Sequence, residues 1–169
     1  MAFIDAQNLP LALAKELVDL TAAAAQEVQQ NGSAQFDFSV DATGRPTTER
    51  YADLTAKINT AALDLVRLIS GPKVIYRHLF VSHYDLAAYQ VALEFDFFNL
   101  VPLDGTLSVT ALAEKAGMDS DRTERILRTL ATQRVFREVP VQGGTAFEHT
   151  AASALIVKEP LLKDVFLMQ

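Results

Sequence analysis

The sequence predicts a mainly α-helical fold, in which a helical region precedes a winged helix-turn-helix subdomain with a small β-hairpin. Apolar residues recur at helical spacing through most of the first 100 positions of this 169-residue chain. Strand, helix, turn, helix and hairpin then follow in the order of a winged helix. We expect a helical region over 1–100, the winged-helix subdomain over 101–152, and the first helices of a further part over 153–169.

The beginning of the sequence predicts two amphipathic helices joined by a polar loop. Apolar residues at spacings of three and four predict a helix over 9–30, which Asn31-Gly32 ends as a left-handed C-cap. Residues 32–47 are polar and contain Gly and Pro, so they predict a loop. Thr47 or Thr48 provides the N-cap of the second helix, which ends before a Gly-Pro pair.

The sequence after this Gly-Pro pair is unusually apolar. A short helix is predicted from Pro72 through Phe80, because proline suits the first helical turn, and a second helical segment follows over 82–98. That segment is apolar on two faces, and a domain of this size seldom covers both. Leaving its large side chains in water would forgo about 1.5–3 kcal/mol each, so we expect a subunit interface. One face carries Tyr84, Ala88, Val91, Phe95 and Phe98, and the other carries Leu86, Leu93, Phe97 and Leu100.

The winged-helix subdomain begins with a short strand and a short helix. Leu107-Ser108-Val109 predicts the strand, because apolar residues flank a polar one at the spacing of a β-strand. Ser108 or Thr110 then caps the helix "ALAEKA", and Gly117 ends it. This pair of elements leads directly into the second helix of the subdomain.

The rest of the subdomain is a second helix and a hairpin. Ser120 or Asp121 caps the helix, which reaches Arg134. "VFREV" and "AFEHT" alternate around "PVQGG" and predict a hairpin with a Gly-Gly turn. A last helix begins near Ala152, Pro160 breaks it, and "LLKDVFLMQ" begins another.

Charge argues against nucleic acid as a partner. Arg122, Arg125 and Arg128 share the solvent side of the second helix of the subdomain and could meet phosphates. The alternative is a solvated helix face that pairs with Glu124 or Glu138. The wing has no Lys or Arg, and the chain has 21 acidic against 15 basic residues, a net charge of −6. These features favour the alternative.

Metal, thiol and nucleophilic chemistry have little support in the sequence. There is no cysteine, which excludes disulfides and thiolate sites. His78 and His83 are five residues apart, so they do not share a helical face as a zinc pair would. Ser82, Ser108 and Ser153 have no histidine at a diagnostic spacing, and His149 is expected to pack or hydrogen-bond at the end of the wing.

Three acidic residues and the N-terminal segment remain as candidate functional features of the sequence. Asp85, Glu94 and Asp96 lie on a largely apolar helix, where a carboxylate can act as acid or base. We favour interface partners or solvent-facing positions for them. The N-terminal residues lack the basic segment of a signal peptide, and no apolar run approaches the roughly 20 residues of a membrane span. We expect a cytoplasmic protein without membrane contact.

Three stretches between about His83 and Pro160 carry a family resemblance. They are "VALEFDFFNLVP", "LSVTALAEKAGMDSDRTERILRTLATQRVFRE" and "FEHTAASALIVKEPLLKD". The combination of "RxLRxLA" and "FRE" with "FxHTxxS" and a downstream proline is specific, whereas no single piece is. The region resembles the N-terminal part of plant and fungal S-adenosylmethionine-dependent O-methyltransferases. The resemblance implies a non-catalytic, helical half with a winged helix, which forms an intertwined homodimer.

The resemblance also implies that the cofactor is bound elsewhere. In that family a domain of alternating strands and helices binds S-adenosylmethionine at a Gly-rich turn. The seven glycines here form no such motif, and the general-base histidine of the family would lie in the same absent domain. The sequence is therefore expected to be the N-terminal part of a longer enzyme of secondary metabolism, which methylates an aromatic or polyketide-like hydroxyl. No catalytic or cofactor-binding residue is expected in this chain.

Candidate site residues follow from the resemblance and from the apolar faces. Phe166 and Met168 are expected to face a substrate pocket between the two halves, with Phe80 and Tyr84 contributed from the dimer helices. Two alternatives remain open: a related protein without methyl transfer, acting as a pathway co-regulator or in pericyclic or dehydration chemistry, and a free-standing winged-helix DNA-binding protein. The candidate dimer-interface residues are Leu13, Leu17, Leu20, Tyr84, Val91, Phe95 and Phe98.

Overall fold

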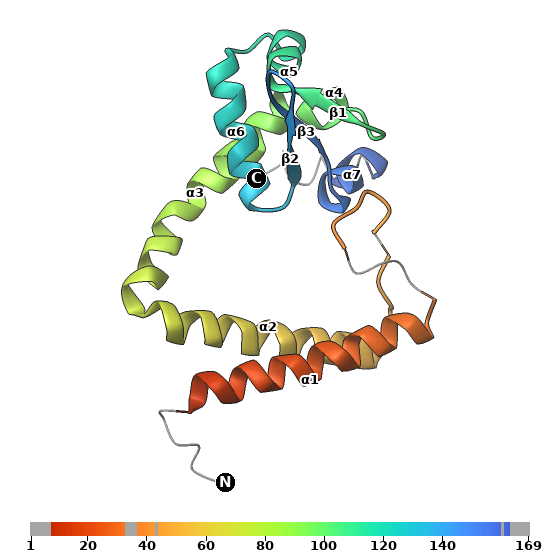
Figure 1. Cartoon of the computed structure of the whole chain (residues 1–169), viewed down its shortest axis with the longest axis vertical. Helices are drawn as coiled ribbons and strands as arrows, with labels where there is room; N and C mark the ends of the chain where they lie inside the picture. Colours follow the sequence, from red (N-terminus) through yellow and green to blue (C-terminus); the bar gives the residue numbers. More distant parts are fainter. Residues whose placement is uncertain (1–7, 33–36, 43, 160, 163–169) are drawn as a thin grey trace. The chain divides into compact units, whose positions relative to one another are not determined.

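The chain is mainly helical and forms two compact units (Figure 1). A computed structural model describes residues 8–32, 37–42, 44–159 and 161–162. Within these ranges, the residues up to 32 and those from 44 to 81 form unit 1. Residues 37–42, and those from 82 onward, form unit 2. The predicted functional boundaries near 100 and 152 stay predictions, since these units reflect backbone contacts.

Unit 1 is built on two long antiparallel helices that lie side by side (Figure 1). Helix α1 spans Leu9–Gln30 and ends at Asn31, as predicted. Helix α2 spans Glu49–Ser70, and the hydroxyl of its N-cap, Thr48, accepts a hydrogen bond from the N–H of Tyr51 at 3.1 Å. The cap satisfies a backbone donor that has no partner within the helix, which fixes where α2 begins.

A buried carboxylate joins the end of α1 to the start of α2. Glu27 is only 6% exposed. Its Oε1 accepts hydrogen bonds from the Thr48 hydroxyl at 2.8 Å and from Asn31 Nδ2 at 3.3 Å, and Arg50 Nε lies 3.5 Å from Oε2. A buried charge without such partners would be strongly destabilising, so these contacts explain how the carboxylate is tolerated.

Helix α3 spans Pro72–Glu94 without interruption. The prediction of a short helix ending at Phe80 was therefore wrong. No Gly, Pro or side-chain cap separates Phe80 from Ser82, so nothing stops the backbone hydrogen bonds there. The break comes instead at Asp96, which adopts a left-handed conformation with φ of 58° and begins the short helix α4, Phe97–Leu100.

The first half of unit 2 follows the predicted order of elements. Strand β1 is Thr106–Ser108, one residue earlier than predicted, and helix α5 is Val109–Ala116. The Ser108 hydroxyl caps α5 by accepting from Ala111 N–H at 3.2 Å. Gly117 follows with φ of 65°, a left-handed conformation that glycine adopts without strain.

Helix α6 spans Ser120–Thr132 and starts with a different cap from the one expected. We predicted Ser120 or Asp121, but the N-cap is Asp119, whose Oδ1 accepts from Arg122 N–H at 3.0 Å. The helix also ends before Arg134, the predicted last residue, which has a left-handed φ of 59°. Asp119 is an equally good capping residue type, and sequence alone did not separate the neighbouring candidates.

The sheet has three antiparallel strands in the order β1-β3-β2. Strand β2 spans Phe136–Val141 and β3 spans Gly144–His149. Val141 pairs with Gly144, so the turn residues are Gln142 and Gly143 rather than the predicted Gly-Gly pair. Gly143, with φ of 91°, supplies the turn conformation, while Gly144 already belongs to the ladder.

Helix α7, Ala151–Lys158, begins at a doubly capped end. The Thr150 hydroxyl accepts from Ala152 N–H at 3.2 Å, and the Ser153 hydroxyl accepts from Thr150 N–H at 3.1 Å. This reciprocal arrangement is a capping box. The predicted start at Ala152 is confirmed to within one residue, whereas Pro160 lies outside the described residues.

The hydrophobic core of unit 2 lies between its helices and the sheet. Aromatic rings from three elements meet there, with Phe98 and Phe136 centred 5.3 Å apart. Leu127 and Leu130 come from the buried side of α6, as its apolar stripe predicts. The largest fully buried side chains of the core are Phe97, Phe136, Phe147, Leu112, Leu127, Leu130 and Val101.

A short segment between α1 and α2 belongs to unit 2 and packs against its last helix. The carbonyl of Phe38 accepts from Ala151 N–H at 3.2 Å, and the carbonyl of Val40 accepts from Lys158 Nζ at 3.2 Å. Ala42 is buried. Residues 37–42 therefore form a strap, held mainly through its own backbone, against α7.

Candidate functional site

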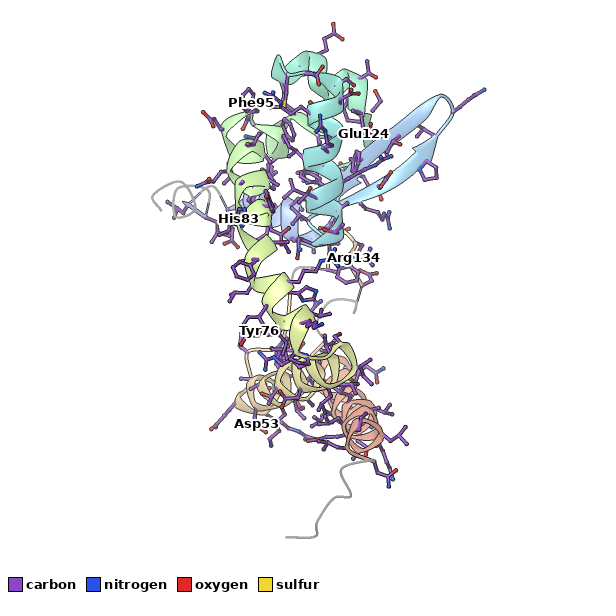
Figure 2. The ribbon with its side chains drawn as sticks, turned by 90° about the vertical axis from the view of Figure 1, so that its left-hand side faces the viewer. Asp53, Tyr76, His83, Phe95, Glu124 and Arg134 are labelled. Atoms are coloured by element: carbon purple, nitrogen blue, oxygen red, sulfur yellow. The ribbon has the colours of Figure 1, made fainter. Side chains whose placement is uncertain are left out.

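The helices leave much apolar surface exposed. On α3, Tyr76, Phe80 and Tyr84 follow one another at four-residue spacing, so they share one side of the helix. Phe80 is 73% exposed and Leu79, beside it, 70%. Figure 2 labels Tyr76 and Phe95 near the two ends of α3. Clustered apolar side chains of this kind typically mark an interaction surface, whereas single ones need no explanation.

The predicted substrate-facing residues are not brought together. Phe80 and Tyr84 lie on the exposed side of α3, and no described cavity contains either of them. Phe166 and Met168 lie outside the described residues. The pocket assignment of all four stays a prediction.

The predicted interface residues fall into three groups. Those on α1, Leu13, Leu17 and Leu20, are partly exposed, and Tyr84 and Phe95 are exposed. Val91 is partly buried. Phe98, by contrast, is 2% exposed and stacks on Tyr89 with ring centres 6.0 Å apart. Phe98 therefore has no surface to offer a partner, and we do not keep it in the interface.

Sequence reasoning missed several exposed apolar residues. The helical stripes were assigned as buried faces, but large side chains on the opposite faces are also apolar and exposed. A second apolar stripe on a helix is the sequence signal that could have found them, as it did for α3. The residues missed in this way are Leu11, Val18, Leu63, Val66 and Ile69.

A groove of about 430 Å³ lies in unit 1 near the end of α2. Its lining is mostly apolar and includes an ion pair between Arg67 and Asp64, whose atoms are 3.3 Å apart. The groove includes Leu13, one of the predicted interface residues. Its other apolar residues are Leu9, Leu68, Pro72 and Ile75.

The arginine face of α6 is paired with acidic residues. Arg128 contacts Glu124 at 2.9 Å and Glu138 at 3.4 Å, as the solvated-face interpretation expects. Arg125 Nε donates to the backbone carbonyl of Asp121 at 3.4 Å. A DNA-reading helix needs free cations for phosphates, so these contacts do not favour the DNA-binding alternative.

His149 is buried at the end of the hairpin, where it joins three elements. Its Nε2 lies 3.0 Å from the carbonyl oxygen of Val101, which can only accept, so Nε2 carries the proton. Nδ1 then accepts from the Ser153 hydroxyl at 2.8 Å. Burial lowers the pKa of His149 below its usual value of 6.5, although backbone hydrogen bonds oppose the shift.

The Ser153–His149 pair was not expected from the sequence. Residues four apart across the start of α7 face each other, and this spacing is the signal that was overlooked. Both side chains are nearly inaccessible, at 0% and 3% exposure, so no substrate can reach the hydroxyl. The pair holds the wing to α7, and the predicted structural role of His149 is confirmed.

The acidic residues near α3 have structural contacts. Asp85 accepts from Gln133 Nε2 at 2.9 Å, and Asp96 accepts from Asn99 Nδ2 at 2.6 Å. Glu94 is exposed. Within the described ranges, no cluster of three or more His, Asp or Glu side chains could hold a metal ion. In the same part of the chain, no helix is both long and apolar enough to cross a membrane.

Comparison with known proteins relates this fold to methyltransferases. Residues 77–159 match the family described as the O-methyltransferase dimerisation domain. The chain is 41% identical over 143 residues to the O-methyltransferase sol2 of Alternaria solani, covering 85% of this chain and 33% of that protein. It is 31% identical over 138 residues to the chlorophenol O-methyltransferase of Trichoderma longibrachiatum, covering 80% of this chain and 29% of that protein. The chain thus spans about a third of the length of these relatives.

Solved structures agree with this relationship at the level of the fold. The crystal structure of OxaC superposes with a TM-score of 0.63 at 17% identity, covering 92% of this chain and 36% of that one. A structure described as a pericyclic reaction enzyme gives a TM-score of 0.55 at 15% identity, covering 85% and 31%. The family match and these relatives place residues 77–159 in the O-methyltransferase dimerisation domain family.

Proposed function

We propose that the chain is a homodimerising, substrate-lining part of a cytoplasmic O-methyltransferase. The observation that carries the proposal is the exposed apolar surface of α3. Leu79, Phe80, Tyr84 and Leu86 are all exposed, and all lie within the matched residues 77–159. The segment matched to a dimerisation domain thus includes several large exposed apolar side chains.

The available burial is large enough for association. In a symmetric pair, these four side chains of α3 occur twice. Burying all eight would contribute roughly 12–24 kcal/mol. The loss of translational and rotational freedom opposes association by about 4–15 kcal/mol. Over most of these ranges the balance favours a dimer, and burial of the exposed residues of α1 and α2 would add to it.

Light scattering at micromolar concentration tests the dimer. The expected result is a particle of twice the chain's mass. Phe80→Asp places a charge on the exposed face of α3 and is expected to give monomers of unchanged helical content by circular dichroism. Val141→Asp, at an exposed apolar position on the hairpin, is the matched control and should stay dimeric. A monomeric parent chain, or a dimer insensitive to Phe80→Asp, would contradict the proposal.

The same proposal assigns methyl transfer to a longer protein that contains this sequence. The donor would be S-adenosylmethionine and the acceptor a hydroxyl on an aromatic or polyketide-like compound. Support comes from relatives about three times as long, one named as a chlorophenol O-methyltransferase, and from OxaC, which was crystallised with SAH and oxaline. These are properties of those proteins, and each needs its own test here.

The described residues do not fit the cofactor. A nucleotide cofactor is typically held by a Gly-rich turn between a parallel strand and a helix. The described sheet is antiparallel, and the glycines after α5 and in the hairpin serve as a helix cap and a turn. We therefore assign this chain no step in the transfer, and expect no binding of S-adenosylmethionine in calorimetry.

The activity is tested on the polypeptide isolated from its natural source. Its intact mass is expected to be about three times that of this chain. With methyl-labelled S-adenosylmethionine and a chlorophenol, the label should appear as an aryl methyl ether. A dimeric natural protein that transfers no methyl group would overturn the activity while leaving the dimer standing.

A further inference from the structure

A pocket of about 700 Å³ lies wholly within unit 2. Its volume is that of a small-molecule site, and it is walled by the strap, the end of α6 and the start of β2. Apolar side chains and cations share the wall. Its residues are Asp37, Phe38, Ser39, Arg128, Ala131, Thr132, Arg134, Phe136, Arg137, Glu138 and Thr150.

One cation in this wall has no carboxylate beside it. Arg128 is paired with Glu124 and Glu138, and Arg137 is paired with Glu148. Within the described part of the chain, no carboxylate oxygen lies within 4.0 Å of the Arg134 guanidinium. That group instead lies 5.7 Å from the centre of the exposed Phe38 ring. Cation and ring together present a surface for an aromatic acid.

The acidic residues of the wall are already occupied. Glu138 contacts Arg128 at 3.4 Å. The carboxylate of Asp37 accepts from the N–H and hydroxyl of Ser39 at 2.9 and 2.6 Å. Glu124 and Glu148, just outside the lining, pair with Arg128 and Arg137, so Arg134 is the cation of this wall that is left for a ligand.

Arg134 occupies a position where glycine is the usual choice. After α5 and after α6 the chain makes the same turn: Met118 N–H reaches back to Ala113 at 2.9 Å, and Val135 N–H to Leu130 at 3.0 Å. This turn requires a left-handed residue, which is glycine in the first case. In the second it is Arg134, at φ of 59°.

The backbone of Arg134 is fixed on both sides of this strained position. Its N–H donates to the carbonyl of Ala131 at 3.0 Å. Its own carbonyl oxygen lies 2.8 Å from the hydroxyl of Thr150. Figure 2 shows Arg134 at the end of α6, with Glu124 farther along the same helix. A strained residue held so firmly beside a cavity is a frequent feature of ligand sites.

The geometry points to a binding site for a small aromatic carboxylate in this pocket. The carboxylate pairs with the Arg134 guanidinium, and the ring packs against the exposed ring of Phe38. Nothing assigned above to dimerisation or methyl transfer uses this pocket, so the inference does not rest on the proposed function.

Binding of 2-naphthoate to the full chain, followed by NMR shift perturbation, is the test. The neutral 2-naphthamide has the same ring and is the matched ligand. We expect shifts at Phe38, Arg134 and Thr150, and roughly tenfold tighter binding of naphthoate. The preference should shrink as salt is added. Equal binding of the two ligands, no binding at millimolar naphthoate, or shifts elsewhere would overturn the assignment.

Variants at Arg134 distinguish the contribution of its charge to binding from its contribution to stability. Arg134→Gln should abolish the preference for naphthoate, and Arg134→Lys should keep part of it. Arg122→Gln removes an exposed arginine near the other end of α6 and should change nothing. Arg134→Gly relieves the left-handed strain, so it should lose binding and unfold at the same or a higher urea concentration. Retained preference in Arg134→Gln, or a lowered midpoint in Arg134→Gly, would overturn the inference.

Discussion

The two units differ in what their amphipathic helices cover. In unit 2, α6 lies against a sheet and buries Leu127 and Leu130 completely, among phenylalanines from three other elements. In unit 1, α1 and α2 pack mainly against each other. The described hydrophobic residues buried there are Ala24, Val28, Leu54 and Ala61, and none is aromatic.

This difference shows that a hydrophobic stripe predicts a helix but not its covering layer. Two packed helices leave their outer faces largely uncovered, so apolar residues there stay exposed. Leu11, Val18 and Ile69 are each about 70% exposed. Unit 2 has a core of its own with fully buried aromatic side chains, whereas unit 1 buries few large apolar side chains.

Truncating one phenylalanine in each unit should give the largest difference in the free energy of unfolding between the units. Phe147 is 0% exposed and lies on the central strand, so Phe147→Ala leaves a cavity and should cost about 3–5 kcal/mol in free energy of unfolding. Phe80→Ala removes the same group from an exposed site and should change the stability of the monomer by less than about 0.5 kcal/mol. Urea denaturation followed by circular dichroism measures both.

The two phenylalanine variants should also differ in how their loss of stability depends on protein concentration. The loss in Phe147→Ala should be the same at low and high concentration, because the ring packs within one chain. Any loss in Phe80→Ala should grow with concentration, because that ring acts through association. A large, concentration-independent loss in Phe80→Ala would show that unit 1 does have a core of its own.

Removing the threonine cap of each unit should give a smaller difference in the free energy of unfolding. The Thr150 hydroxyl is buried and lies 2.7 Å from the carbonyl of Val135, so Thr150→Ala removes a cap and strands a buried acceptor. That loss should be about 2–3 kcal/mol. Thr48 is partly exposed, and Asn31 and Arg50 still contact the buried Glu27 carboxylate to which its hydroxyl donates at 2.8 Å, so Thr48→Ala should cost about 1–2 kcal/mol. Similar losses in the two variants, measured by urea denaturation, would contradict this ranking.

Local signals predicted much of the fold. Helix ends and starts were predicted correctly at several capping residues, because a cap acts within a few residues of the helix end. These residues are Asn31, Thr48, Ser108 and Gly117. The winged-helix order followed from alternation and turn residues. The errors at Asp119 and Gly143 were shifts of one residue between equally suitable types, which only the hydrogen-bond register decides.

The candidate sites were less predictable, because they depend on contacts between distant segments. The strap residue Phe38 contacts Arg134 only after unit 2 has folded. No spacing in the sequence predicts this pair. Phe98 followed the apolar stripe of α3, but Asp96 ends that helix first and turns the ring into the core. Helical periodicity cannot report such a break when no Gly or Pro marks it.

The smallest expected effect is a pH dependence confined to unit 2. Burial holds the pKa of His149 below 6.5, so below that pH the unfolded chain binds more protons than the folded one. The free energy of unfolding should therefore be level above about pH 7 and fall as the pH drops through 6.5 toward the lower folded pKa. His149→Gln should flatten this slope, while His83→Gln, at an exposed position on α3, should keep it. A slope that persists in His149→Gln would mean that other groups set it and that the buried imidazole is not the coupling site.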